Sequence, residues 1–273
     1  MNFKKKMSVA LAAAVCCSMI SSFSIAATAE EYNYSEESCI VSEMYASDPA
    51  YTEAVKLAGL KFNSGLAKKV QSYDGKSSKS AVTYSKSRTK RFFDKLYKNA
   101  SKMSEDPSKA SMSVTLVSKD QVVSMAVKGN KSKTVMYMDV DGSSIGMALY
   151  QDAETAYLLD ISTKEMISYE SESEEDLSSA VVSTAEDAAD LGIKDSQKGK
   201  LFKFKYKDKG YYYEVFETSD GSTIGCVFDT KLNLVMMVED SIIYSVKITT
   251  SVKSSDLAVP DDYEEMDLSS YGY

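Results

Sequence analysis

The feature of this sequence that most constrains its fold is a change in hydrophobic period after about residue 110. From residue 111 onward, apolar residues alternate with polar or small ones, as in strands that have one covered face. In 111–117, for example, Met112, Val114 and Leu116 alternate with serine and threonine. Similar runs follow over 121–128, 132–140, 144–150, 154–161 and 164–170.

The connections between these runs are too short for parallel pairing. Parallel neighbours need a crossover of roughly a dozen residues or more, whereas hairpins need only a tight turn. The breaks are Lys119-Asp120, Asp141-Gly142, Asp152-Ala153 and Thr163-Lys164, all of which fit hairpin turns. The first set of strands is therefore predicted to be an antiparallel meander.

A second set of strands is predicted after residue 200, over 202–206, 211–218, 222–229, 231–239 and 241–251. Apolar spacing predicts helices at 48–70, 87–103 and 175–191, and the last of these follows an acidic stretch. The predicted fold is α+β. It is one large, curved antiparallel sheet of about 11 strands, a half-barrel, wrapped around the helices at 87–103 and 175–191.

The predicted organisation has four parts. Residues 1–29 fit a signal peptide, since three lysines precede an apolar run that ends in Ala27-Thr28-Ala29. An uncleaved anchor and a lipoprotein signal at Cys16 or Cys17 are the alternatives. The other parts are a leader with an N-terminal helix and linker (30–86), the sheet domain (87–260) and an acidic tail (261–273). We expect a secreted or cell-surface protein with no transmembrane span after cleavage.

Charge argues against a nucleic-acid partner. The net charge is −8, and it falls to −11 without residues 1–29, which hold three lysines and no acids. Nucleic-acid binding needs a basic footprint, and attraction to an anionic membrane needs basic clusters. Overall charge therefore predicts neither a nucleic acid nor an anionic membrane as a partner.

Catalytic and metal-binding motifs are absent from the sequence. Without histidine, the chain cannot form a Ser-His-Asp or Cys-His site, and it lacks the commonest transition-metal ligand. Asp139-Val140-Asp141-Gly142-Ser143 faintly resembles a calcium loop, but an apolar stretch follows it and a hairpin fits better. We expect no enzyme activity, no cofactor and no bound metal.

Two cysteines, Cys39 and Cys226, lie after the predicted signal peptide. Export would permit a disulfide between them, which would close a long loop. Two unpaired thiols are the alternative, with Cys226 in the core of a strand. The sequence leaves both interpretations open.

Several phrases resemble the LolA/LppX-like lipoprotein-carrier fold over roughly 87–262. They are the strand–turn–strand at 156–166 (AYLLDISTKEM), the hairpin at 228–232 (FDTKL) and Leu257-Ala258-Val259-Pro260 before an acidic pair. The resemblance implies a curved sheet around helices. Members of known function in that family carry lipids, lipid-modified proteins or glycolipids in the concavity.

Methionine is the residue type that most suggests a ligand. Met is flexible and suits adaptable apolar surfaces as well as ordinary cores, so both interpretations stay open. The hypothesis is that the concave face binds a lipid-like or other apolar ligand. The alternative is a protein-interaction module with a filled core and a protein partner. The predicted ligand-lining residues are Met112, Met125, Met136, Met138, Met147, Phe204, Phe228 and Met236.

Overall fold

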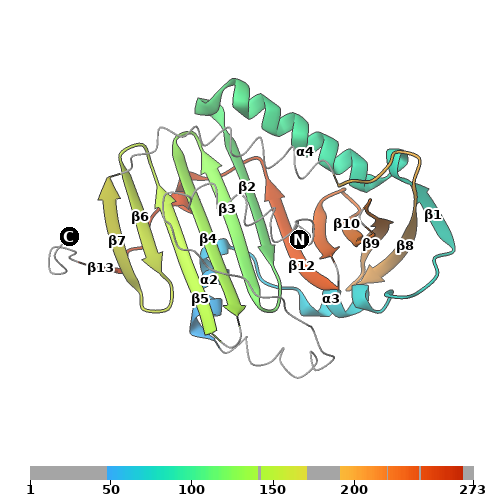
Figure 1. The fold of residues 1–273 in the computed structure, drawn as a ribbon, viewed down its shortest axis with the longest axis horizontal. Helices are drawn as coiled ribbons and strands as arrows, with labels where there is room; N and C mark the ends of the chain where they lie inside the picture. Colours follow the sequence, from blue (N-terminus) through green and yellow to red (C-terminus); the bar gives the residue numbers. More distant parts are fainter. Residues whose placement is uncertain (1–47, 141–142, 171–190, 220, 240, 267–273) are drawn as a thin grey trace.

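The fold is taken from a computed structural model, which describes residues 48–140, 143–170, 191–219, 221–239 and 241–266 (Figure 1). The predicted signal peptide, most of the leader, Cys39 and nearly all of the predicted helix at 175–191 lie outside the described residues. Among the described residues, no helix is both long and apolar enough to cross a bilayer.

One mixed sheet of 13 strands dominates the structure and is not closed into a barrel. Its strand order is β1-β8-β9-β10-β11-β12-β2-β3-β4-β5-β6-β7-β13. The strands are β1 (Ser80–Thr83), β2 (Ser111–Val117), β3 (Gln121–Lys128), β4 (Lys131–Val140), β5 (Ser143–Gln151), β6 (Thr155–Asp160), β7 (Glu165–Glu170), β8 (Lys198–Tyr206), β9 (Lys209–Glu217), β10 (Thr223–Asp229), β11 (Leu234–Glu239), β12 (Ile242–Thr249) and β13 (Glu264–Glu265).

Both predicted meanders are present, as β2 to β7 and β8 to β12, and they join where β12 pairs with β2. Two short strands extend the predicted sheet and change its class. β1 pairs antiparallel with β8, and β13 pairs parallel with β7, so the sheet is mixed and its edges are β1 and β13. Both additions pair segments far apart in sequence, which local periodicity cannot reveal.

Three α-helices accompany the described sheet, namely α2 (Pro49–Ala58), α3 (Ser64–Gln71) and α4 (Arg88–Glu105). The single helix predicted at 48–70 is divided in two, because Gly59 adopts φ 67° and ends α2 in a left-handed C-cap. The helix predicted at 87–103 is confirmed as α4. Short 3₁₀ turns are η3 (Tyr84–Lys86), η4 (Pro107–Lys109) and η5 (Ser254–Leu257).

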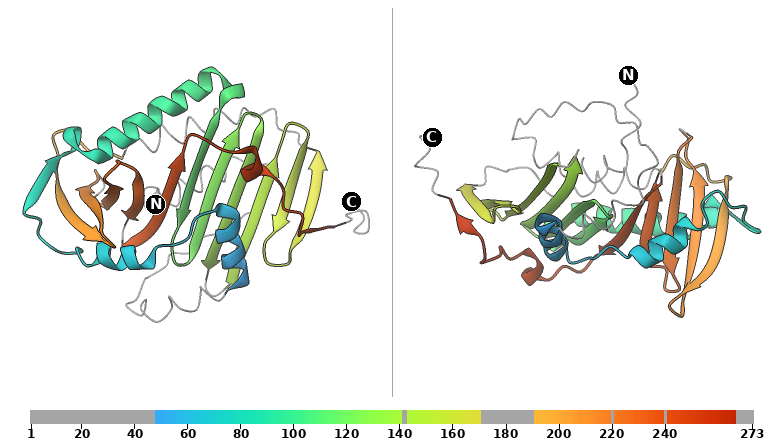
Figure 2. Two further views of the ribbon diagram at one scale, coloured as in Figure 1. Left: turned by 180° about the vertical axis from the view of Figure 1, so that it is seen from behind. Right: turned by 90° about the horizontal axis from the view of Figure 1, so that it is seen from below.

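The helices divide between the two faces of the sheet. Strand register places Val117, Val122, Tyr137 and Met236 on one face, which we call the first face. There α2 covers β3 to β5 and α3 covers β8 to β12 through two buried apolar clusters. Figure 2 shows α2 in front of the strands when the molecule is seen from behind. On the opposite, second face, α4 covers a third cluster that spans β9, β10, β11, β12, β2 and β3.

The start of α4 is fixed by a buried carboxylate. Glu214 on β9 is fully buried and accepts hydrogen bonds from the Thr89 backbone N–H (3.0 Å), the Thr89 hydroxyl (2.9 Å) and the Arg88 backbone N–H (3.2 Å). The Arg88 guanidinium lies 3.3 Å from the same carboxylate and 3.6 Å from the centre of the Tyr212 ring. A negative charge at a helix N-terminus interacts favourably with the positive end of the helix dipole. The charge-assisted hydrogen bonds of Glu214 therefore hold the start of α4 on the sheet.

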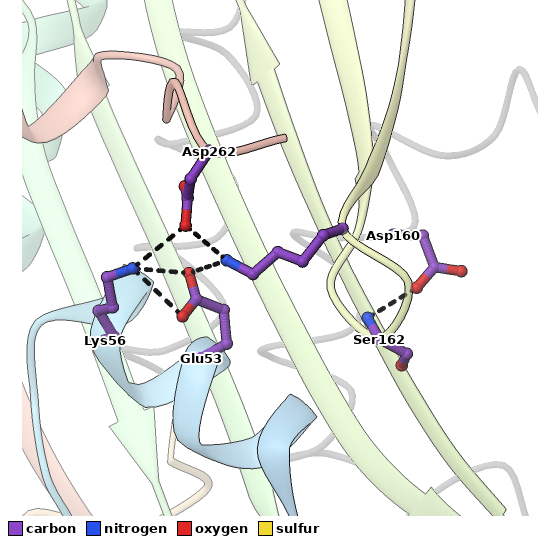
Figure 3. Close-up of polar contacts among 6 residues, drawn as sticks. Glu53, Lys56, Asp160, Ser162 and Asp262 are labelled. Carbon is purple, nitrogen blue, oxygen red and sulfur yellow. Dashed lines mark hydrogen bonds and ion pairs between the residues drawn. The ribbon is translucent and has the colours of Figure 1, made fainter. Parts of the chain in front are cut away.

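An ion cluster ties the described part of the C-terminal tail to α2 and to the β6–β7 turn (Figure 3). The Lys164 ammonium lies 2.7 Å from Glu53 and 2.9 Å from Asp262, and Lys56 lies 3.6 Å from Asp262. Tyr263 is buried beside them, with the Lys164 ammonium 4.3 Å from its ring centre. Residues 261–266 of the predicted acidic tail therefore pack against the sheet domain.

Candidate functional site

The second face of β4 to β7 is the candidate site, because its apolar side chains join none of the buried clusters formed by the described residues. Register places these side chains opposite one another on neighbouring strands. Met136 faces Met147, Met138 faces Ile145, Leu149 faces Leu158, and Leu158 faces Ile167. We call this surface the methionine face and define it as Met136, Met138, Ile145, Met147, Leu149, Leu158 and Ile167.

The methionine face is only partly shielded from solvent. Ile145 is 46% exposed, and the six other members are half-buried. On the first face of the same strands, by contrast, Val135, Tyr137 and Leu159 are fully buried. Apolar area left accessible in this way costs free energy in water, and a contiguous patch of it commonly marks a binding surface.

The first face of these strands is firmly closed by α2. The Asp48 carboxylate caps α2 by accepting from the Ala50 N–H (2.7 Å), and it also accepts from the Tyr137 hydroxyl (2.6 Å). Tyr51 donates to the Ser118 carbonyl (2.7 Å), and burial, with a contribution from Asp120, raises the pKa of Tyr51 to about 12. The two faces of one half of the sheet therefore differ sharply in how they are covered.

The eight predicted lining residues fall in three places. Met136, Met138 and Met147 lie together on the methionine face. Met112, Met125 and Phe228 are buried in the cluster beneath α4. Phe204 and Met236 are buried in the cluster beneath α3, on the opposite face of the sheet. The structure therefore does not bring the eight residues to one surface.

Sequence reasoning missed Ile145, Leu149, Leu158 and Ile167, which complete the methionine face. The available signal was hairpin register, since alternation within β5, β6 and β7 places these residues on the same side as Met147. The predicted lining residues are all methionine or phenylalanine, so these four aliphatic neighbours are not among them.

Cys226 is a buried free thiol on β10, in the cluster beneath α4. Burial raises the pKa of this thiol to about 12, so it stays protonated at neutral pH and is a poor nucleophile. Because Cys39 lies outside the described residues, the disulfide between Cys39 and Cys226 stays a prediction.

On either side of the predicted hairpin turn, Asp139 pairs with Ser144 and Val140 with Ser143 across the antiparallel strands β4 and β5, while Asp141 and Gly142 lie outside the described residues. Three consecutive tyrosines, Tyr211-Tyr212-Tyr213, lie on β9. Tyr213 packs beneath α3, and the Arg88 guanidinium lies over the ring of Tyr212.

Within the described ranges, no group of three or more acidic, cysteine or histidine side chains is placed to hold a metal ion.

Comparison with known proteins adds little to this geometry. No family model matches the chain, and no curated protein matches it. Among solved structures, the chain is similar to an uncharacterized conserved protein from Thermus thermophilus, with 8% sequence identity and a TM-score of 0.30. That alignment covers 63% of this chain and 97% of the other.

Proposed function

We propose that this protein is a non-enzymatic, extracytoplasmic binder of a lipid-like or other apolar ligand, and that the ligand lies on the methionine face. The observation that carries the proposal is the contiguous set of half-buried apolar side chains on β4 to β7, which joins no buried cluster of the described residues. The expected export signal and the absence of histidine agree with a carrier rather than an enzyme.

The chemistry of the surface favours a flexible apolar ligand. Unbranched methionine side chains can repack around apolar ligands of different shape. Met136 and Met147 face each other directly across β4 and β5. Leu149 and Leu158 extend the same surface across the next strand pair. An acyl chain lying across these strands would gain contact with each of them without any specific polar partner.

The test compares the two faces of one half of the sheet. The double variant Met136→Gln/Met147→Gln keeps side-chain length but adds a polar group to the proposed contact surface. Met166→Gln is the matched control, because Met166 is also half-buried in this half of the sheet but packs on the first face with the α2 cluster. Circular dichroism melting confirms that each variant folds.

Binding is measured by titration with a dansyl-labelled fatty acid and by native mass spectrometry of the purified protein for co-purifying lipid. The double variant should weaken binding by about tenfold, since burying the exposed half of each methionine contributes roughly half of the 1.5–3 kcal/mol for a full side chain. The control should change binding by less than about threefold. A wild-type protein that carries no lipid and ignores the probe would contradict the proposal and favour an interaction module with a filled core.

A further inference from the structure

Charge is distributed very unevenly along the sheet. Residues 68–91 and 198–209, which form the second half of α3, β1, the start of α4 and β8, carry 14 lysines and arginines and only two acids. We call this region the basic end. At the opposite edge, residues 152–170 and 261–266, which contain β6, β7 and β13, carry nine acids and one lysine. Figure 1 shows β1 and β8 at one extreme of the molecule and β7 with β13 at the other.

The two ends act independently in salt solution. Ten strand intervals separate β8 from β7 in the sheet order, which corresponds to roughly 48 Å along the curved sheet at about 4.8 Å an interval. The Debye length at physiological ionic strength is only about 8 Å. The acidic end therefore does not cancel the positive potential near β8, and the overall net charge of −8 conceals it.

Eleven of the twelve lysines at the basic end form no ion pair among the described residues, and the exception is Lys90, whose ammonium lies 2.5 Å from Asp94. Among the described residues, none of the six lysines of 198–209 forms an ion pair with a carboxylate. At the acidic end, by contrast, Lys164 is held by both Glu53 and Asp262. Lysines are common at exposed sheet edges, where they prevent edge-to-edge pairing, but that role needs only a few of them.

Tyrosine rings lie among these lysines. The Lys69 and Lys76 ammonium groups lie 5.6 and 5.7 Å from the centre of the Tyr73 ring, and Lys207 lies 5.4 Å from that of Tyr206. Tyr73 itself packs against Phe202, with ring centres 4.9 Å apart. Half-buried tyrosines next to lysines suit the headgroup layer of a bilayer, where amphipathic rings and ammonium groups both find partners.

We propose that the basic end is a docking surface for an anionic phospholipid bilayer. This inference goes beyond the proposed ligand binding, because it uses β1, β8 and α3 and none of the methionine face. Twelve of the 14 basic residues are lysine, a point charge suited to diffuse headgroup attraction rather than bidentate phosphate recognition. Tyr73 and Tyr206 are half-buried, so they offer no open platform on which nucleic-acid bases could stack.

The experiment is vesicle co-sedimentation of the full chain without its predicted signal peptide. Vesicles of phosphatidylglycerol mixed with phosphatidylcholine are compared with vesicles of phosphatidylcholine alone, at low and at high salt. The test variant is Lys79→Glu/Lys198→Glu/Lys200→Glu, which reverses three exposed charges of the basic end. The matched control is Lys128→Glu/Lys247→Glu/Lys253→Glu, which reverses three exposed charges elsewhere and changes the net charge equally.

The wild type should co-sediment with the anionic vesicles at low salt and stay in the supernatant at high salt, because exposed charges are screened. The basic-end variant should bind more than about tenfold more weakly, and the control should stay within about threefold of the wild type. Equal binding to both vesicle types, or equal losses in the two triple variants, would overturn the proposal. So would wild-type binding to soluble polyphosphate without binding to vesicles, since that result would assign the surface to a polyanion.

Discussion

The two halves of the sheet are built from similar alternating strands, yet they are covered differently. Strands β10 to β12 have α3 on the first face and α4 on the second, so both of their faces contribute buried clusters. Strands β4 and β5 have α2 on the first face, while their second face is the methionine face. The alternation of a strand therefore shows that it has two distinct faces, but packed helices decide which of them becomes core.

The sharpest test of this contrast is to remove one large side chain from each half. Phe228 is fully buried on β10, with its ring centre 5.8 Å from that of Phe92 on α4. Phe228→Ala should lower the free energy of unfolding by about 3–5 kcal/mol, because it leaves a cavity in a packed core. Met147→Ala on the methionine face should cost about 1 kcal/mol or less.

Urea unfolding followed by circular dichroism measures both values. Similar losses for the two variants would show that Met147 is packed as tightly as Phe228. The contrast between the halves would then fail, and so would the surface on which ligand binding is proposed.

A second test concerns how α4 is held on the covered half. Glu214→Ala removes the carboxylate that accepts from the Thr89 N–H and hydroxyl, and it leaves these donors and the Arg88 guanidinium without that partner. Because Arg88 keeps part of its side chain in solvent, we expect a loss of about 2–3 kcal/mol rather than the larger cost of a fully buried pair.

Glu214→Gln serves as the control, since it keeps the shape and can still accept a hydrogen bond from Thr89. Its cost should be clearly smaller in the same urea titration. If both variants unfold at the wild-type urea concentration, Glu214 does not hold α4 on the sheet.

Much of this fold could be predicted from the sequence because its strands follow one another through short hairpins. The turn at Asp152-Ala153, for example, fixes β5 next to β6, and alternation then fixes the register. The helix α4 could be predicted equally well, since Phe92, Phe93 and Leu96 recur at helical spacing before Pro107. Local information is enough wherever neighbours in sequence are neighbours in space.

The remainder depends on long-range pairing that no local pattern encodes. β1 pairs with β8 through partners such as Ala81 and Lys200, and β13 reaches β7 from the C-terminal segment. The coverage of each face likewise depends on where α2, α3 and α4 dock. Part of the candidate site was therefore visible as methionines on strands, whereas Met112 and Met236 became core because α4 and α3 pack over them.

The smallest expected effect lies at the edge of the methionine-bearing half, where β13 is the last strand of the sheet. Lys164 holds this edge through Glu53 and Asp262, and the backbone N–H groups of Glu264 and Met266 donate to β7 and its turn. Lys164→Met should speed hydrogen exchange at these two amides by about two- to fivefold, as expected for a partly exposed ion pair. Lys131→Met is the control, since its contact with Asp152 is longer, at 3.9 Å.

The same contact predicts a pH dependence with a definite sign. Burial alone would lower the pKa of Lys164, but its hydrogen bonds to Glu53 and Asp262 outweigh burial and raise the pKa above its usual value of 10.5. The stabilisation is therefore fully present below the unfolded-state pKa and is lost as the pH rises through the higher folded-state value. The ratio of exchange rates between Lys164→Met and the wild type should stay constant from neutral pH to about pH 10 and fall toward one above that. A ratio of one already at neutral pH would mean that the backbone pairing of β13 holds this edge without the ion cluster.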